Sequence, residues 1–325
     1  MTIALDIFRA LADATRLRIV ALVRHMELSV GELAQVLGQS QPRVSRHVKI
    51  LVDAQLLERR KEGSWVFVAL GRPAAVAPIA AALDAWGLHE PDHWAVADAA
   101  RLAAVRADRA ASAAAWFEAH AGEWDAIRSL HVADSAVEAA MARVLGEGPL
   151  GRLIDIGTGT GRMLELFGDA AETALGIDRS SEMLRLARAK LAGRANTELR
   201  QADLYALPMG DGAADVAILH HVLHFAQQPG AAITEAARVL APGGRLLIAD
   251  FAPHDREELR TQDAHVRLGF ADDQIAGWAD AAGLAMARVE TLGGGALTVK
   301  LWLARKPASS KAGRVGTTLH EVKAA

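Results

Sequence analysis

An apolar segment that runs directly into a glycine-rich turn constrains the fold of this chain most. Leu153-Ile154-Asp155-Ile156 has the apolar interior of a buried strand, and Gly157, Gly159 and Gly161 follow at once. Glycines at a strand end let backbone amides approach a ligand that side chains would exclude. The pattern therefore predicts a sheet with a ligand site at the carboxyl end of this strand.

The remainder of the C-terminal half indicates an α/β fold. Short apolar runs alternate there with helical segments, which is typical of a doubly wound, mostly parallel sheet. We expect seven strands, over residues 152–157, 173–178, 197–201, 215–220, 245–251, 288–292 and 298–304.

Acidic residues end two of these strands. Asp178 ends the second strand, and its carboxylate can accept hydrogen bonds from both ribose hydroxyls. Asp203 closes the third strand and suits an adenine amino group. Arg162 stands where a dinucleotide fingerprint would have glycine, so the pattern favours a nucleoside ligand over a dinucleotide.

These motifs, together with residues 215–224 and 238–246, resemble class I S-adenosylmethionine (SAM)-dependent methyltransferases over about residues 110–305. The resemblance implies a Rossmann-like methyltransferase fold and SAM or S-adenosylhomocysteine (SAH) as the cofactor. It places the glycines beside the methionine part, Asp178 at the ribose, and Met183 and Asp203 at the adenine. The cofactor-binding residues expected are Asp155, Gly157, Thr158, Gly159, Gly161, Asp178, Arg179, Met183, Asp203, Leu204 and His220.

Three histidines are the candidate catalytic residues. Methyl transfer needs an in-line nucleophile more than an elaborate acid–base apparatus. His220, His221 and His224 follow the fourth strand, so one could position or deprotonate an acceptor, although each could equally be structural. The acceptor is an unknown small molecule. Arsenite methyltransferases hold arsenic with cysteines, and because this chain has none, that activity is not expected.

Residues 15–70 have the pattern of a winged helix-turn-helix. Ser29 is expected to cap one helix, Gly38 to end it, and Ser40 to cap the next. Residues 56–70 form two short strands around a turn at 62–64, the wing. The second helix and the wing present basic and polar side chains, which form either a DNA-binding surface or a solvated face. The DNA-binding residues expected are Ser40, Gln41, Arg43, Ser45, Arg46, His47, Lys49, Arg60 and Lys61.

The segments 12–19 and 40–47 and the wing resemble the ArsR/SmtB family of winged-helix repressors over about residues 5–72. The resemblance implies binding to double-stranded operator DNA. It also implies a homodimer formed by the first helix and the helix over residues 73–86. Ser29 and Gly31 stand where metal-sensing members have cysteines, so metal sensing is not expected at this site.

Charge and composition exclude several classes of protein and of binding site. Residues 1–70 hold 10 basic and 7 acidic residues against a net charge of −3 for the chain, so attraction to phosphate belongs to the N-terminal part. The absence of cysteine excludes disulfides and thiolate zinc sites, and we expect no metal. No apolar stretch is long enough to span a membrane, and the start lacks a basic n-region, which predicts a cytoplasmic protein without a membrane partner.

The middle of the chain is alanine-rich and helical on both sides of a break at 87–92. His89, His93, His120 and His131 lack metal-ligand spacing and are interpreted as structural. Trp116, Phe117, Trp124 and Ile127 form either core packing or a lid over a substrate pocket. The predicted division is 1–72 winged helix, 73–148 helical dimerisation, linker and lid region, 149–305 methyltransferase domain and 306–325 flexible tail.

Two hypotheses follow. The chain is a transcriptional regulator whose methyltransferase domain binds SAM or SAH and biases its affinity for DNA. Alternatively, it is a small-molecule methyltransferase whose winged helix regulates its own operon or only dimerises it. A sensing fold and a working enzyme need the same cofactor contacts, so the residues leave both open.

Overall fold

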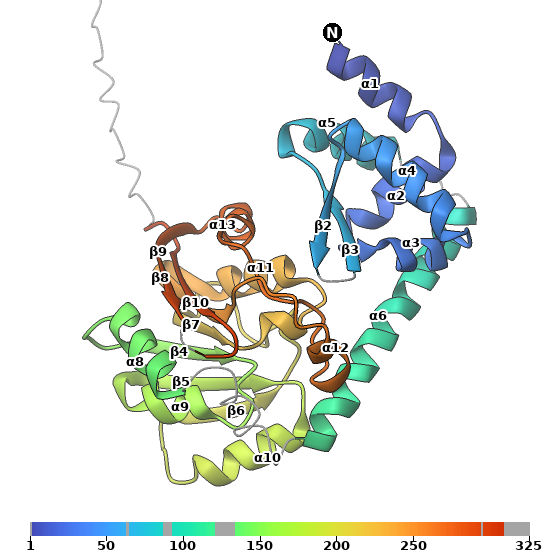
Figure 1. Cartoon of the computed structure of the whole chain (residues 1–325). Helices are drawn as coiled ribbons and strands as arrows, with labels where there is room; N and C mark the ends of the chain where they lie inside the picture. The colour runs from blue at the N-terminus through green and yellow to red at the C-terminus, as the bar shows by residue number, and fades with distance from the viewer. Residues whose placement is uncertain (1, 63–64, 87–92, 121–133, 294, 309–325) are drawn as a thin grey trace, which may run out of the picture.

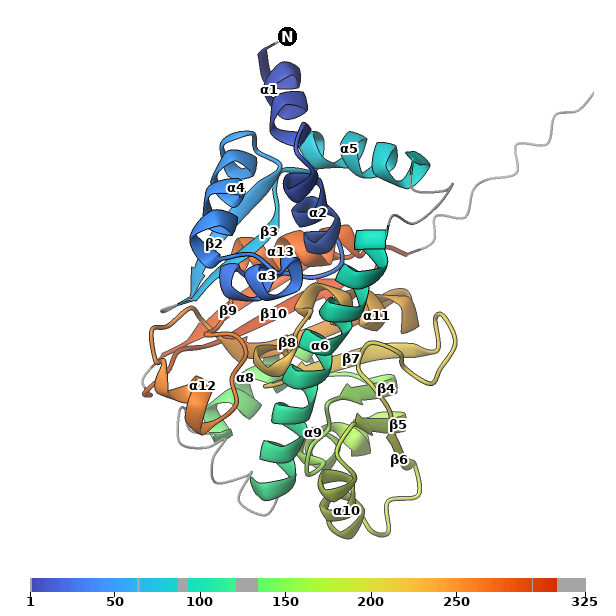
Figure 2. The ribbon, with the colours of Figure 1, turned by 90° about the vertical axis from the view of Figure 1, so that its right-hand side faces the viewer.

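The computed structural model describes residues 2–62, 65–86, 93–120, 134–293 and 295–308. An N-terminal helical domain with a small sheet lies beside a C-terminal domain built on a large sheet (Figure 1). The long helix α6 (His93–His120) packs on the N-terminal domain and runs alongside the C-terminal domain to α10 (Ser181–Lys190), as Figures 1 and 2 both show.

The N-terminal domain has the predicted winged helix-turn-helix. Its antiparallel sheet has the order β1-β3-β2, with the wing formed by β2 and β3. Strand β1 was not predicted, because two residues are too short for any periodicity. The elements are α1 (Thr2–Leu11), α2 (Ala14–Val23), β1 (Leu28–Ser29), α3 (Val30–Leu37), α4 (Gln41–Asp53), β2 (Leu57–Glu62), β3 (Trp65–Leu70) and α5 (Pro73–Trp86).

The helix-turn-helix is defined by its caps. Ser29 forms a capping box with Glu32, whose amide donates to the Ser29 hydroxyl at 3.2 Å, and Gly38 ends α3 in the left-handed region with φ +64°. Ser40 is the N-cap residue of α4, but its hydroxyl makes no capping hydrogen bond, so that expectation was wrong. Pro42, at the second position of the helix, lacks one of the two amides that such a hydroxyl can accept.

Helix α6 contributes to the N-terminal core. Its Leu102 and Val105 are buried in the same cluster as Val48 of α4. The buried Asp98 of α6 also forms an ion pair of 2.6 Å with Arg18 of α2. Residues beyond 72 therefore complete the packing of the winged helix, and the predicted domain boundaries stay predictions.

The C-terminal sheet has seven strands, as predicted, in the order β6-β5-β4-β7-β8-β10-β9. It is mostly parallel, and β10 runs antiparallel to both of its neighbours. This is the mixed Rossmann-like sheet of methyltransferases. The strands are β4 (Gly151–Ile156), β5 (Ala171–Asp178), β6 (Thr197–Gln201), β7 (Ala214–His220), β8 (Leu240–Phe251), β9 (Ala285–Leu292) and β10 (Val299–Arg305).

Helices cover both faces of this sheet. Along β7, Val216 and Ile218 pack into one hydrophobic cluster, and Ala217 and Leu219 pack into the other. This alternation is what a doubly wound fold requires. Helices α8 (Asp134–Leu145) and α9 (Arg162–Phe167) lie in the first cluster, and α11 (Pro229–Val239) and α13 (Asp272–Ala281) lie in the second.

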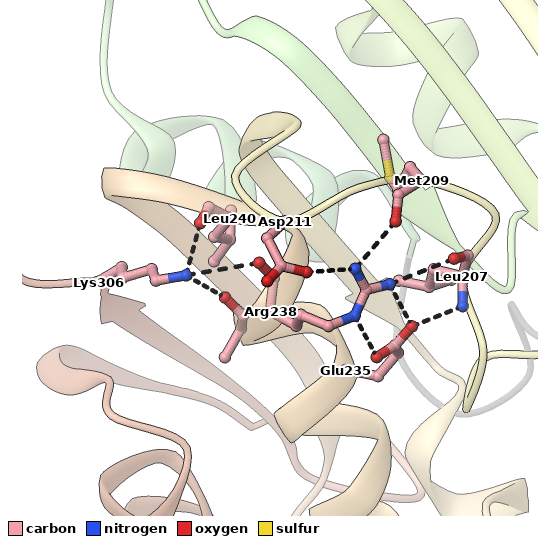
Figure 3. A network of polar contacts seen from close by, with 8 residues as sticks. Leu207, Met209, Asp211, Glu235, Arg238, Leu240 and Lys306 are labelled. Carbon is pink, nitrogen blue, oxygen red and sulfur yellow. Dashed lines mark hydrogen bonds and ion pairs between the residues drawn. The ribbon is translucent and has the colours of Figure 1, made fainter.

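A polar network ties Lys306, directly after β10, and the loop before β7 to helix α11 (Figure 3). Arg238 donates to the Glu235 and Asp211 carboxylates at 2.6 and 2.8 Å, and the hydrogen bond from Arg238 lowers the pKa of Glu235. Lys306 donates to the carbonyls of Ala237 and Leu240 at 2.8 and 2.7 Å. Lys306, where the predicted tail begins, is therefore anchored in the fold.

None of the described helices is long and apolar enough to cross a membrane. Of the residues expected to form core packing or a lid, Trp124 and Ile127 lie outside the described residues, as do the side chains of Trp116 and Phe117.

Candidate functional site

A cavity of about 310 Å³ opens at the carboxyl ends of β4, β5, β6 and β7. It lies at the point where the chain reverses its direction along the sheet, between β4 and β7, which is where such sheets bind ligands. Ten of the eleven predicted cofactor residues line it, namely Asp155, Gly157, Thr158, Gly159, Asp178, Arg179, Met183, Asp203, Leu204 and His220.

The backbone amides of the glycine loop were expected to approach a ligand, but three of them form hydrogen bonds within the protein. The amides of Gly157 and Thr158 donate to the carbonyl of Ile177 at 2.7 and 2.8 Å, and the amide of Gly159 donates to Asp178 at 2.8 Å. These amides are engaged within the protein, whereas a phosphate needs several free donors. The loop therefore offers close approach to a ligand and suits a nucleoside without a phosphate.

At two glycines of the loop, neighbouring side chains lie so close that a Cβ atom would collide with them. A Cβ on Gly157 would lie 2.5 Å from Cγ2 of Val222, and the residue has φ +76°. Gly161 is the predicted cofactor residue that does not line the cavity. With φ +84°, it is the N-cap residue of α9, and a Cβ there would lie 2.8 Å from Leu191, so the missing side chain lets α9 pack at this point. Its contact with a cofactor stays a prediction.

Asp178 is held in place by two backbone amides. Its Oδ2 accepts the Gly159 amide and its Oδ1 accepts the Ser180 amide, both at 2.8 Å. Burial raises the pKa of Asp178, and the hydrogen bonds from the backbone oppose that shift. Each carboxylate oxygen has a second lone pair, so both can still accept ribose hydroxyls.

The loop after β6 supplies the outer wall. Asp203 is exposed at the rim, and its Oδ1 accepts the Tyr205 amide at 3.0 Å. Tyr205 lines the cavity and was missed from sequence, although it lies two residues beyond Asp203 in the same loop. Its hydroxyl accepts the Gln228 amide at 3.1 Å, and burial raises the pKa of this phenol. Phe225 and Gln227, also missed, line the cavity from the segment after β7.

The three candidate catalytic histidines have different positions. His220 and His221 line the cavity, and His221 has φ +53°, which is strained for a residue with a side chain. His224 lies behind the wall, where its Nδ1 is 2.8 Å from Oδ1 of Asp250. Asp250 is completely buried, and that burial raises its pKa to about 6.

Among the described residues, His221, His224 and Asp250 could offer ligand atoms to a metal, within 4.8 Å of one another. The carboxylate and His224 are already hydrogen-bonded, which is the arrangement of an acid–base pair. The expectation that the chain needs no metal stays a prediction. His89 and His131 lie outside the described residues, as do the side chains of His93 and His120.

The candidate DNA surface lies on α4 and the wing. The outward residues of α4 are exposed at Gln41, Arg43, Arg46 and Lys49, while Ser45 and His47 are half-buried. On the wing, Lys61 is exposed.

Arg60 is less available than the sequence suggested. It forms ion pairs with Glu27 at 3.0 Å and with Glu58 at 2.8 Å. A phosphate would have to compete with both carboxylates for this guanidinium.

The fold and the two surfaces define a protein that joins a winged helix-turn-helix to a Rossmann-like sheet with a cavity at its carboxyl edge. Comparison with known protein families gives the same two domains. Residues 13–59 match the family model of bacterial regulatory proteins of the arsR family, and residues 154–248 match a methyltransferase-domain model. The chain thus consists of an ArsR-family helix-turn-helix domain followed by a class I methyltransferase domain.

Individual relatives match each half separately. The arsenical resistance operon repressor of Escherichia coli is 48% identical over 63 residues, which are 19% of this chain and 54% of that protein. The malonyl-[acyl-carrier protein] O-methyltransferase of Methylococcus capsulatus is 34% identical over 134 residues, 38% of this chain and 49% of that protein. The chain therefore spans about half the length of these relatives.

A solved structure supports the fold of the C-terminal part. A chain from the complex of the Haloferax volcanii Trm112 methyltransferase activator with a methyltransferase superposes with a TM-score of 0.52 at 18% identity. The match covers 61% of this chain and 99% of that one. Relationship to SAM-dependent methyltransferases implies that this domain binds SAM, and the ArsR-family domain implies DNA binding.

Proposed function

We propose that this chain is a transcriptional regulator whose methyltransferase domain binds SAM or SAH, and whose affinity for operator DNA depends on that ligand. The observation that carries the proposal is a buried contact between the two domains. Arg267, from the segment that packs behind the cofactor cavity, forms an ion pair of 2.8 Å with Glu27 beside the wing. An enzyme with an independent DNA-binding module would not need to bury a charged pair between them.

The residues of the cavity fit this ligand. Asp178 would hold the ribose hydroxyls, Asp203 the adenine amino group, and Met183 would pack near the adenine ring. The glycine loop would lie along the methionine part, where the amides of Gly157, Thr158 and Gly159 are already engaged within the protein. The cavity volume of about 310 Å³ is at the lower end for small-molecule sites.

The DNA-binding unit is proposed to be a homodimer. Leu5 and Phe8 of α1 are exposed to 50% and 63%, a large apolar surface for one short helix. In Figure 1, α1 projects away from the body of the molecule. Pairing through α1 and α5 would cover this surface and present two copies of α4 to half-sites one duplex turn apart.

Isothermal titration of SAM and SAH, with and without the DNA upstream of the gene, tests the proposal. Coupling between two sites is reciprocal, so the ligand that changes DNA affinity must bind with a different Kd when DNA is present. We expect at least one cofactor form to show this difference. Equal Kd values for both forms, with and without DNA, would exclude a cofactor-dependent regulator.

A second candidate function is a small-molecule methyltransferase with an unknown acceptor. The observation that favours it is the position of His220 and His221 on the cavity wall, in front of the buried His224–Asp250 pair. SAM supplies an electrophilic methyl group when it is bound. A neutral imidazole at His220 would orient an acceptor or take its proton.

The enzymatic alternative is tested by SAH formation from SAM in the presence of a small-molecule cell extract. If it is correct, His220→Ala should lower turnover much more than it lowers SAM affinity. No SAH formation with any extract, or a His220→Ala variant with unchanged turnover, would exclude this role for His220.

A further inference from the structure

The segment after β8 lies directly behind the wall of the cofactor cavity. Residues 220–227 supply six lining residues of the cavity, including His221 and Gln227. On the far side of the same wall, the carbonyl of His224 accepts the amides of Val266 and Arg267 at 2.9 and 3.0 Å. The backbone at Arg267 is therefore hydrogen-bonded to the wall that a bound ligand would touch.

The side chain of Arg267 extends from this wall into the N-terminal domain. It is fully buried, and its Nη1 lies 2.8 Å from Oε2 of Glu27. Its Cζ is 4.2 Å from the centre of the Phe67 ring on β3, a cation–π contact. Its Nη2 donates to the carbonyl of Gln227 at 3.5 Å, so one guanidinium touches both domains.

The contact continues to the face of the wing that lies beside α4. Glu27 also pairs with Arg60 of β2 at 3.0 Å. Arg260, nearby in the same segment as Arg267, stacks over Trp65 at 5.4 Å. Trp65 borders a groove with Gln41 and Ser45 at the start of α4. Figures 1 and 2 show the β2–β3 hairpin extending from the N-terminal domain toward the C-terminal domain.

We propose that Arg267 transmits occupancy of the cofactor cavity to the wing. This inference rests on the proposed function and assigns its coupling to one residue. Ligand that packs against Phe225 and Gln227 shifts the wall, and the wall shifts Arg267 through its bonds to His224 and Gln227. A buried guanidinium that moves away from Glu27 loses this ion pair, so Glu27 and Phe67 follow it. The cavity wall and the wing thus move together between two arrangements, and the ligand favours one of them.

The test compares wild type with Arg267→Gln, and uses Arg143→Gln as a matched control. Arg143 forms an ion pair of similar length, 2.7 Å, with Glu290 in the C-terminal domain. Two quantities are measured in the full chain with SAM and with SAH. The first is amide hydrogen exchange of residues 57–62 and 65–70 without DNA, and the second is the Kd for the upstream DNA.

We expect ligand to change wing exchange in wild type and in Arg143→Gln, and to change their DNA Kd about tenfold, within the usual range of coupling. Arg267→Gln should bind the ligand within about threefold of wild type, yet lose both responses. Phe67→Leu keeps the apolar contact and removes the cation–π contact, so it should weaken both responses, and it serves if Arg267→Gln fails to fold by circular dichroism.

The failures are distinguishable. If ligand affinity in wild type is the same with and without DNA, the proposed function is wrong, and the coupling falls with it. If wild type couples and the folded Arg267→Gln and Phe67→Leu variants couple equally well, the proposed function stands and the role of Arg267 is wrong.

Discussion

The Asp178 carboxylate accepts the amide of Gly159 at 2.8 Å, which joins the end of β5 to the glycine loop after β4. The same carboxylate accepts the Ser180 amide at the start of α10. The Asp178 side chain, itself the proposed acceptor of the ribose hydroxyls, thus positions both the loop and the start of the helix. Residues 19 positions apart in sequence act as one unit.

Replacing Asp178 by Asn should weaken SAH binding by about 10- to 100-fold, because a hydrogen bond to a charged group contributes about 1.5–3 kcal/mol. Asn keeps only one acceptor oxygen, so either the Gly159 amide or the Ser180 amide loses its partner as well. Asp169→Asn is the control, since Asp169 is an exposed carboxylate paired with Arg194 outside the cavity. Titration calorimetry measures both, and an unchanged Kd for Asp178→Asn would contradict the assignment.

A Gly157→Ala substitution should destabilise the protein by about 1–3 kcal/mol. The added methyl would lie 2.5 Å from Val222, and φ +76° disfavours any side chain. Gly277→Ala should instead stabilise by about 0.5–1 kcal/mol, because Gly277 is within helix α13 with open space around it. Urea unfolding of both variants gives the comparison, and equal effects would be unexpected.

The free energy of unfolding should decrease as the pH rises from about 4 to about 6, because of the raised pKa of Asp250. Burial raises its pKa to about 6 in the folded protein. The unfolded chain releases this proton near pH 4, so between these values the native state binds more protons and each pH increment favours unfolding. The loss amounts to about 3 kcal/mol for a shift of about two pKa units.

The comparison with Asp250→Asn isolates this effect. Its free energy of unfolding, measured by urea titration at pH 4, 5, 6 and 7, should depend less on pH than that of wild type. Parallel pH profiles for the two proteins would show that the pKa of Asp250 is not raised in the folded protein.

Arg46→Ala should weaken binding to the upstream DNA and lower the slope of log Kd against log salt by about 1, the value for one lost phosphate contact. Arg46 is exposed on α4 beside the other candidate DNA residues. Arg185→Ala, which removes an exposed arginine from α10, should leave the slope unchanged. Fluorescence anisotropy at several salt concentrations measures it, and equal slopes for all three proteins would argue against α4 as the DNA-contacting helix.

Phe8→Glu should convert a dimer into a monomer of 34.4 kDa, because it places a charge in the apolar surface of α1. Val96→Glu tests whether any exposed apolar residue would do the same, since Val96 is similarly exposed on α6. Light scattering after size exclusion gives the mass. A Phe8→Glu protein that stays dimeric would rule out pairing through this face of α1.

Local patterns predicted most of the secondary structure. The apolar interior of β4 and the cap at Ser29 depend on neighbours within a few residues, and both are present. The failed expectation involves detail that depends on packing, because Ser40 makes no cap bond. The role of Gly161 beside a cofactor stays a prediction.

The sequence by itself determined the two domain types and most of the cavity, because strand ends carry their acids and glycines in a fixed order along the chain. Only the tertiary structure decided how the domains meet. Arg267 and Glu27 are 240 positions apart, and nothing in either local pattern distinguishes them from surface charges. A buried ion pair exists only once two separately folded surfaces exclude water between them, and that depends on the packing of the whole chain.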